Sequence, residues 1–238
     1  MAYIKTPRGK LKYKKKFLYI GIKQIDRDVA LENLKVVLDV LNKKGVTIVP
    51  ACGTLLGIIR EHNFIEWDED IDTFVKSEDK DKLLDALWDL KEQGFEVARS
   101  YRYGHLYSII RNNEYIDFYI VDKISPEVRT NYGTDFVFEK HLTELIDWEF
   151  RGVTIKVPKD YDECLEFLYG DWRTPVKWAD FDINKWGIFK MRVGYFLKNA
   201  FPPRIGLKLN KMYHRKDLKK FLSRCEKRGV KLNYKLDF

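Results

Sequence analysis

The sequence predicts an α+β fold in which a small mixed sheet is flanked by helices. The chain has 238 residues, of which 45% are hydrophobic, so it can bury one substantial core. The predicted elements run helix, strand, short helix, strand, helix and then several strands, which differs from the regular alternation of a doubly wound parallel fold. The longest clean apolar run, at 17–22, is far below the roughly 20 residues of a membrane span.

The first half of the chain alternates helices with short strands. In chain order, we predict a helix, a strand, a short helix, a strand and a helix at 24–44, 46–49, 55–61, 71–75 and 77–94. Gly45 is typical of a helix stop, and Gly53-Thr54 is predicted to be a turn that ends the first strand. Ser77 is a candidate N-cap, because three acids in the next four residues suit the first turn of a helix.

The second half begins with consecutive strands. We predict strands at 95–100, 106–111 and 115–121, and further short strands within 135–157. Arg151-Gly152 is predicted to be a hairpin turn. The last clear helix starts at Asp160, with Glu163 placed for a capping box, and stops at Gly170.

Charge divides the chain into three parts. Residues 1–25 carry eight basic and no acidic side chains, residues 185–238 have a net charge of +13, and the part between them has −13. We therefore predict a basic N-terminal segment at 1–23, a folded domain at 24–180 and a basic, partly helical C-terminal extension at 181–238. The acidic centre makes nucleic acid an unlikely partner, because a general nucleic-acid binder usually has a basic folded body.

Bulky apolar residues lie among the basic ones near the C-terminus, at Phe189, Tyr195, Phe196, Leu197 and Phe201. Such a mixture suits an anionic membrane surface, and it would suit RNA almost as well.

The three cysteines are odd in number and widely spaced, so they predict no disulfide framework. We expect a cytoplasmic protein, with the inner face of the membrane as its candidate peripheral location.

The most informative stretch places five acids within Glu66–Asp72, directly before a strand. If this segment is extended, the carboxylates of Asp70 and Asp72 point to one face while Ile71 points into the core. Asp117 lies inside another apolar strand and is a candidate third carboxylate. Clustered carboxylates repel one another unless a cation offsets them, so we predict a Mg²⁺ or Mn²⁺ site at these three aspartates.

The string GTLLGIIREHNFIEWDEDID, residues 53–72, resembles the signature of the LicD-type phosphotransferases, which include the fukutin-like enzymes and have a nucleotidyltransferase fold. Residues 157–163 and 168–172 resemble the second hallmark of that family, and the two matches bracket residues 51–175. The sequence departs from the usual pattern at Thr54, Glu66 and Glu69, and none of these departures removes a carboxylate from Asp68, Asp70 or Asp72.

The resemblance implies roles for individual residues. Asp70, Asp72 and Asp117 would be the catalytic metal ligands, and Asp117 could also take the proton of an acceptor hydroxyl. Gly53 and Thr54 would donate hydrogen bonds to phosphate oxygens. The substrate-binding set is completed by a bidentate phosphate contact from Arg60 and by Asp68, which would ligate directly or from a second layer.

The implied activity is the transfer of a phosphorylated small alcohol, such as phosphocholine or an alditol phosphate, from a CDP-linked donor to a glycan hydroxyl. The acceptor would be a glycan or lipid-linked glycan in cell-surface polysaccharide synthesis, such as lipopolysaccharide or capsule. One alternative is another nucleotidyltransferase-fold enzyme that attaches a nucleotide to RNA, protein or a small molecule. A second is a non-catalytic membrane- or RNA-binding module, which the retained carboxylates make the weakest of the three.

Overall fold

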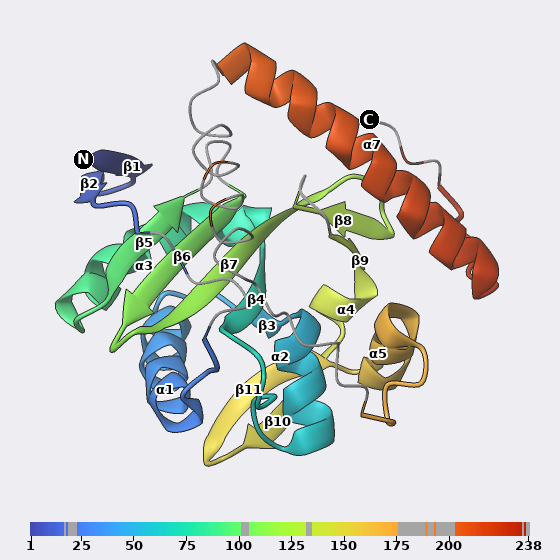
Figure 1. Cartoon of the computed structure of the whole chain (residues 1–238), viewed down its shortest axis with the longest axis horizontal. Coiled ribbons are helices and arrows are strands. Elements are labelled where there is room, and N and C mark those ends of the chain that lie inside the picture. The colour runs from blue at the N-terminus through green and yellow to red at the C-terminus, as the bar shows by residue number, and fades with distance from the viewer. Residues whose placement is uncertain are drawn as a thin grey trace.

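The computed structural model describes residues 1–16, 18, 23–100, 105–131, 135–175, 189, 193, 203–234 and 236. A mixed seven-stranded sheet lies at its centre, with the strand order β3-β4-β7-β6-β5 and with β8 and β9 continuing from β7 (Figure 1). Its strands are β3 (Val49–Pro50), β4 (Ile71–Lys76), β5 (Glu96–Ser100), β6 (Leu106–Arg111), β7 (Glu114–Lys123), β8 (Val128–Thr130) and β9 (Phe136–Phe138). Only the β4–β7 pair is parallel among these described strands, and the predicted α+β class is confirmed.

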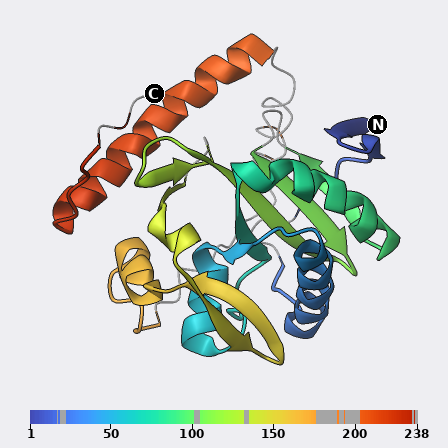
Figure 2. The same ribbon diagram turned by 180° about the vertical axis from the view of Figure 1, so that it is seen from behind.

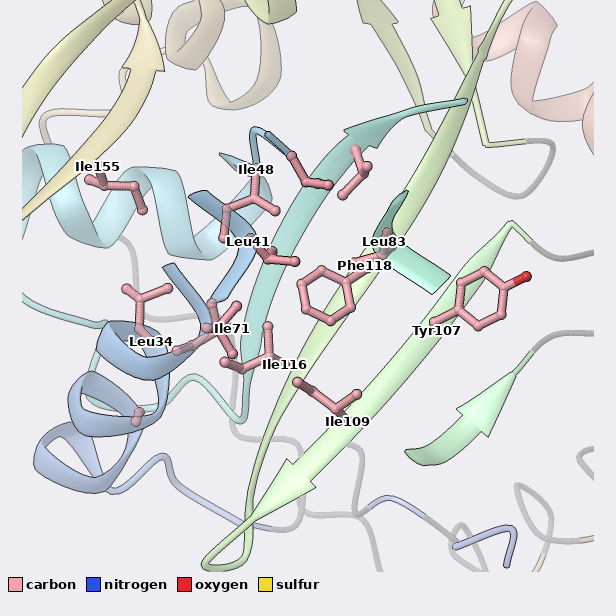
Figure 3. Packing of buried hydrophobic residues seen from close by; sticks show 14 of the residues in the cluster. Leu34, Leu41, Ile48, Ile71, Leu83, Tyr107, Ile109, Ile116, Phe118 and Ile155 are labelled. Carbon is pink, nitrogen blue, oxygen red and sulfur yellow. The ribbon is translucent and has the colours of Figure 1, made fainter. Parts of the chain in front are cut away.

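Helices α1 (Arg27–Lys43) and α3 (Lys80–Glu92) cover one face of the sheet, as the view from behind shows (Figure 2). Asp26 caps α1, because its carboxylate accepts hydrogen bonds from the backbone N–H groups of residues 28 and 29. The apolar side of α1 packs against strand residues that point to the same face. Figure 3 shows Leu34 and Leu41 of this helix next to Ile71 and Ile116.

The remaining elements lie around the sheet. They are the helices α2 (Cys52–Leu56), α4 (Lys140–Thr143), α5 (Tyr161–Tyr169) and α7 (Pro203–Lys227), a π-helical turn (Gly57–Glu61), a 3₁₀ turn (Ser77–Asp79), and two hairpins, β1 (Ala2–Thr6) with β2 (Gly9–Tyr13) and β10 (Leu145–Phe150) with β11 (Val153–Pro158). The β1–β2 hairpin lies near β5 and α3, and the β10–β11 hairpin lies near β3. The predicted turn at Arg151-Gly152 is confirmed, since both residues have positive φ between β10 and β11.

Four local predictions were wrong. Ser77 does not cap α3 by its side chain, because α3 follows a 3₁₀ turn. The predicted strand at 46–49 contributes only Val49, which pairs with β4 through β3. Gly53-Thr54 is not a turn but part of helix α2, which continues directly into the π-helical turn. Glu163 makes no capping box, because its carboxylate accepts a hydrogen bond from Lys140 at 2.5 Å and the Asp160 side chain caps nothing.

The basic N-terminal segment contains a hairpin that the sequence did not indicate. The β1–β2 hairpin packs its Leu11 into the main core, and Arg8 at its turn pairs with Asp85 and Asp89 of α3. Tyr195, Phe196, Leu197 and Phe201 lie outside the described residues. Among the residues that the structure describes, no helix is both long and apolar enough to cross a membrane.

Candidate metal centre

Three aspartates meet at the junction of β4 and β7. Strand pairing sets Asp72 directly opposite Asp117, and Asp70 stands two residues before Asp72 on the same face. One carboxylate oxygen from each of the three lies within 4.8 Å of the other two. Ile71, which lies between Asp70 and Asp72, is buried in the main core on the opposite face. The predicted alternation of this segment is therefore confirmed.

Burial dominates the electrostatics of these carboxyl groups. It raises the pKa of Asp70 and Asp72 well above the aspartate range, and repulsion from neighbouring carboxylates adds to the rise. Burial also raises the pKa of Asp117, while the guanidinium of Arg99 opposes that rise. Glu69 shares this environment, and burial with repulsion from nearby aspartates raises its pKa to about 7. A bound cation would relieve this repulsion.

The three aspartates fit a small divalent cation. Oδ1 of Asp72 and Oδ1 of Asp117 are buried and have no hydrogen-bond partner among the described residues. Buried polar atoms normally have partners, and two carboxylate oxygens of one cluster that have none among the described protein groups fit a bound cation. Carboxylate oxygens are the ligands that Mg²⁺ and Mn²⁺ prefer. No other group of three candidate ligand side chains occurs in the described part of the chain.

The start of helix α2 fixes one side of the centre. The Thr54 hydroxyl accepts a hydrogen bond from the backbone N–H of Asp72 at 2.9 Å, and the N–H of Ala51 donates to the carbonyl of Asp72 at 2.9 Å. Gly53 leaves room for the Asp68 carboxylate, since a Cβ at this position would lie 2.5 Å from Oδ2 of Asp68. Gly53, Thr54 and Asp68 therefore border the metal centre, and their predicted contacts with substrate phosphate stay predictions.

Arg60 joins the two sequence hallmarks. Its Nε donates to the Glu61 carboxylate at 2.8 Å, and its Nη1 donates to the carbonyl of Trp172 at 3.0 Å. Trp172 is buried, and its indole N–H donates to Asp162 in α5 at 2.9 Å. Arg60 thus ties the first hallmark to the second, a role that the sequence did not reveal. These two hydrogen bonds occupy Nε and Nη1 of Arg60. The phosphate contact predicted for Arg60 stays a prediction.

Arg99 is the functional candidate that the sequence analysis missed. It is buried in β5, its Nε donates to the Ser108 hydroxyl at 2.9 Å, and its Nη2 pairs with Oδ2 of Asp117. A lone arginine in the predicted strand at 95–100 carries no signal of this pairing, because the pairing depends on strand register across three strands. Knowledge of the β5–β6–β7 register would have revealed it.

A largely apolar cavity of about 400 Å³ lies next to the metal centre. Its wall includes the aromatic side chains of Phe74, Phe136, Phe138, Phe167 and Phe221. Cys52 lines the cavity, and the pKa of its thiol is raised by burial and by the charges of Asp135 and Asp72, so the cavity adjoins the carboxylates. His141 contributes a buried Nε2 that has no hydrogen-bond partner among the described residues.

Three residues in or directly before the first hallmark lie outside the buried core. Trp67 is 41% exposed and does not pack under the carboxylates. Cys52 is half-buried with φ +48°, so it is a site-bordering residue in a left-handed conformation and not a simple core residue. His62 is exposed at the end of the π-helical turn, also with positive φ.

Comparison with known sequences supports the resemblance that these motifs indicate. The model of the LicD/FKTN/FKRP nucleotidyltransferase domain matches residues 45–160, a range that contains all three aspartates. An uncharacterised protein of Rickettsia typhi is 25% identical over 138 residues, which make up 56% of this chain and 43% of that protein. An uncharacterised protein of Rickettsia prowazekii is 26% identical over 141 residues, or 56% of this chain and 51% of that protein. The chain therefore spans about half the length of these relatives.

Solved structures give only distant similarities. ANT(2″)-Ia in complex with adenylyl-2″-tobramycin has 13% identity and a TM-score of 0.42, with 80% of this chain and 99% of that chain covered. The lincosamide antibiotic adenylyltransferase LnuA, bound to lincomycin, has 12% identity and a TM-score of 0.41, with 68% and 93% covered. Residues 45–160, which match the model of the LicD/FKTN/FKRP nucleotidyltransferase domain and contain the string at 53–72, support a LicD-type family assignment for this chain.

Proposed function

We propose that this protein is a metal-dependent transferase that moves a phosphorylated small alcohol from a CDP-linked donor to a glycan hydroxyl. The observation that carries the proposal is the carboxylate cluster of Asp70, Asp72 and Asp117, with its two orphaned oxygens, inside a LicD/FKTN/FKRP domain. Phosphocholine and alditol phosphates are the transferred groups we favour. The acceptor would be a glycan or lipid-linked glycan of a surface polysaccharide such as lipopolysaccharide or capsule.

Asp70, Asp72 and Asp117 would hold Mg²⁺ or Mn²⁺. When bound, the ion would neutralise charge on the diphosphate and polarise its phosphorus. Thr54 and Ala51 would hold the Asp72 backbone in place by their hydrogen bonds at 2.9 Å. Their contribution is preorganisation: the carboxylates would be in position before substrate arrives.

The reaction would form a bond from the acceptor hydroxyl oxygen to the phosphorus that carries the alcohol. The bond from that phosphorus to the oxygen of CMP would break, and CMP would leave. Asp117 is completely buried and paired with Arg99, so we propose it as a ligand and assign the hydroxyl proton elsewhere. Asp70 and Asp72 are half-buried and so more accessible than Asp117, and we propose that one of these two carboxylates receives that proton.

The cavity beside Cys52 would hold an organic part of the substrate. Its volume of about 400 Å³ lies in the range of small-molecule sites, and its aromatic walls suit a ring. Because the cavity adjoins the carboxylates, a ring bound there would leave an attached phosphate near Asp72.

The test is product analysis after incubation with Mg²⁺ and candidate nucleotides. CMP released from CDP-choline or CDP-ribitol, and absent after chelation by EDTA, is the expected result. Pyrophosphate released from CTP or ATP, with no CMP from a CDP-linked donor, would instead favour nucleotide transfer to RNA, protein or a small molecule. No product from any donor in the presence of a glycan acceptor extract would contradict both enzymatic assignments.

We further propose that the protein acts in the cytoplasm, at the inner membrane face, and docks through helix α7. Phe221 and Cys225 of this helix are buried against Phe138 and Phe167, which fixes the side that faces the protein. The opposite side exposes basic residues, including Arg215, Lys216, Lys219 and Lys227. Each basic residue near an anionic membrane contributes about 1 kcal/mol, so this side would suffice for reversible binding.

Charge reversal tests the docking without removing buried residues. Lys216→Glu, Lys219→Glu and Lys227→Glu together should abolish sedimentation with phosphatidylserine vesicles at low salt. A matched triple reversal at exposed lysines of the acidic body, Lys43 and Lys91 with Lys156, should leave it unchanged. Equal vesicle binding by both triple variants would contradict docking through α7.

A further inference from the structure

We propose that Arg99 is a positioning residue of the carboxylate centre, and that a β-bulge in β5 aims it there. The inference rests on the proposed use of the three aspartates as a cation site. It adds a cationic member to that site and assigns it two effects, which are orientation of one ligand and selection of the charge of the bound ion.

The strand register builds the arrangement. Arg99 of β5 lies opposite Ser108 of β6, Ser108 lies opposite Asp117 of β7, and Asp117 lies opposite Asp72 of β4. The preceding row across the same four strands is entirely apolar and buried in the main core: Val97, Ile109, Ile116 and Ile71. Successive rows face opposite sides of a sheet. The row that runs from Arg99 through Ser108 and Asp117 to Asp72 therefore faces away from that core.

A β-bulge in β5 places Arg99 in the same row as Ser108 and Asp117. The pairing of β5 with β6 shifts between Val97 and Arg99, so that one extra residue, Ala98, is accommodated. Regular pairing after Val97 would instead set Arg99 opposite Tyr107, whose side chain lies in the main core. A charged side chain there would be buried among apolar groups at high cost. Bulges commonly re-aim a side chain next to a functional site, and this one turns Arg99 toward Asp117.

The guanidinium of Arg99 binds one carboxylate oxygen of Asp117 and makes no hydrogen bond to the other. Its Nε donates to the Ser108 hydroxyl at 2.9 Å, which fixes the plane of the group, and its Nη2 pairs with Oδ2 of Asp117. Oδ1 of Asp117 is buried with no hydrogen-bond partner among the described residues, as is Oδ1 of Asp72. The planar fork of arginine thus restrains the carboxylate so that one oxygen remains for a cation.

Arg99 also sets the charge of the centre. Asp70, Asp72 and Asp117 carry three negative charges when all are ionised, and the guanidinium of Arg99 offsets one of them. Without the guanidinium the same centre would carry three negative charges and would favour a trivalent ion more strongly. The ratio of affinities for a trivalent and a divalent cation therefore reports the charge at position 99, whereas a merely structural arginine would leave that ratio unchanged.

The experiment measures dissociation constants for Mn²⁺ and Tb³⁺ by calorimetric titration of the full chain. Arg99→Met should lower the ratio of the Tb³⁺ constant to the Mn²⁺ constant by about tenfold or more, because a unit charge a few ångströms from the ion is removed. Arg99→Lys keeps the charge and loses the fork. It should leave the ratio within about twofold of wild type and weaken Mn²⁺ binding by about threefold to tenfold.

Arg111→Met is the matched control, because Arg111 lies in the same sheet but bonds to Asn33, Gln93 and Glu32, away from the carboxylates. It should change neither constant. A wild-type ratio in a folded Arg99→Met, or wild-type Mn²⁺ affinity in Arg99→Lys, would overturn the proposal. If Arg99→Met fails to fold by circular dichroism, the Arg99→Lys result decides. Wild-type protein that binds neither ion would refute the cation site itself and this proposal with it, whereas CMP release is a separate readout of the transferase.

Discussion

Asp70→Asn removes one negative charge from the carboxylate centre and nearly keeps the shape of the side chain. The ligand oxygens lie within 4.8 Å of one another. Two like charges at that distance repel by about 3 kcal/mol at an effective dielectric constant of about 20, and partial protonation reduces this value. We expect the metal-free variant to be more stable than metal-free wild type by about 1–2 kcal/mol, a rise in Tm of about 2–8 °C for a chain of this size.

The response to metal should change in the opposite direction. A ligand that binds only the folded state, at 100 times its Kd, stabilises by about 2.7 kcal/mol. Wild type should gain stability of this order with Mg²⁺, and Asp70→Asn should gain little. The assay is thermal unfolding in EDTA and across a Mg²⁺ series. Glu66→Gln, which changes an exposed acid four residues away, should behave as wild type. An Asp70→Asn variant that is less stable in EDTA, or that keeps the wild-type response to Mg²⁺, would refute the reasoning.

Three further results are expected. Asp117→Asn should lower the turnover number about 100-fold or more with little change in donor KM, measured as steady-state CMP release; an unchanged turnover number would make Asp117 structural. Gly57→Ala should destabilise by about 1–3 kcal/mol in urea unfolding, because the new Cβ would lie 2.7 Å from the Asn63 carbonyl oxygen, whereas helix propensity alone predicts stabilisation. Arg129 lowers the pKa of Glu78 from 4.5 to about 2, so their pairing stabilises fully above pH 4.5 and is lost as pH falls toward 2. In Glu78→Gln, the free energy of unfolding should therefore fall less steeply than in wild type as pH is lowered from 4.5 toward 2. The same slope in both proteins would contradict this pairing.

The features predicted correctly from the sequence are local. The alternation of Asp70, Ile71 and Asp72 follows from the period of a strand, and it put two carboxylates on one face as expected. The helix at 27–43 and the hairpin turn at Arg151-Gly152 likewise follow from periodicity and from turn residues. Asp117 was predicted to join the two because a charged residue in an apolar strand is costly unless it has a partner, and strand pairing sets it opposite Asp72.

The features that were missed depend on contacts between distant segments. Gly53-Thr54 looked like a turn, yet the Thr54 hydroxyl pairs with the Asp72 backbone and the segment is helical. Arg99 reaches Asp117 only because a bulge shifts the register of β5, and no local pattern encodes that shift. Arg60 bonds to the Trp172 carbonyl, more than a hundred positions away in the chain. Such pairings follow from the assembled sheet and its neighbouring helices.

The most direct test of the central claim is a count of bound Mn²⁺ by electron paramagnetic resonance. Wild-type protein should bind one Mn²⁺ per chain at the carboxylate centre, and Mg²⁺ should compete for it. Asp72→Asn should lose this ion, because its carboxylate supplies one of the orphaned buried oxygens, while Glu66→Gln should retain it. Mn²⁺ bound equally by wild type and Asp72→Asn, or by neither, would contradict the assignment of Asp70, Asp72 and Asp117 as a metal centre.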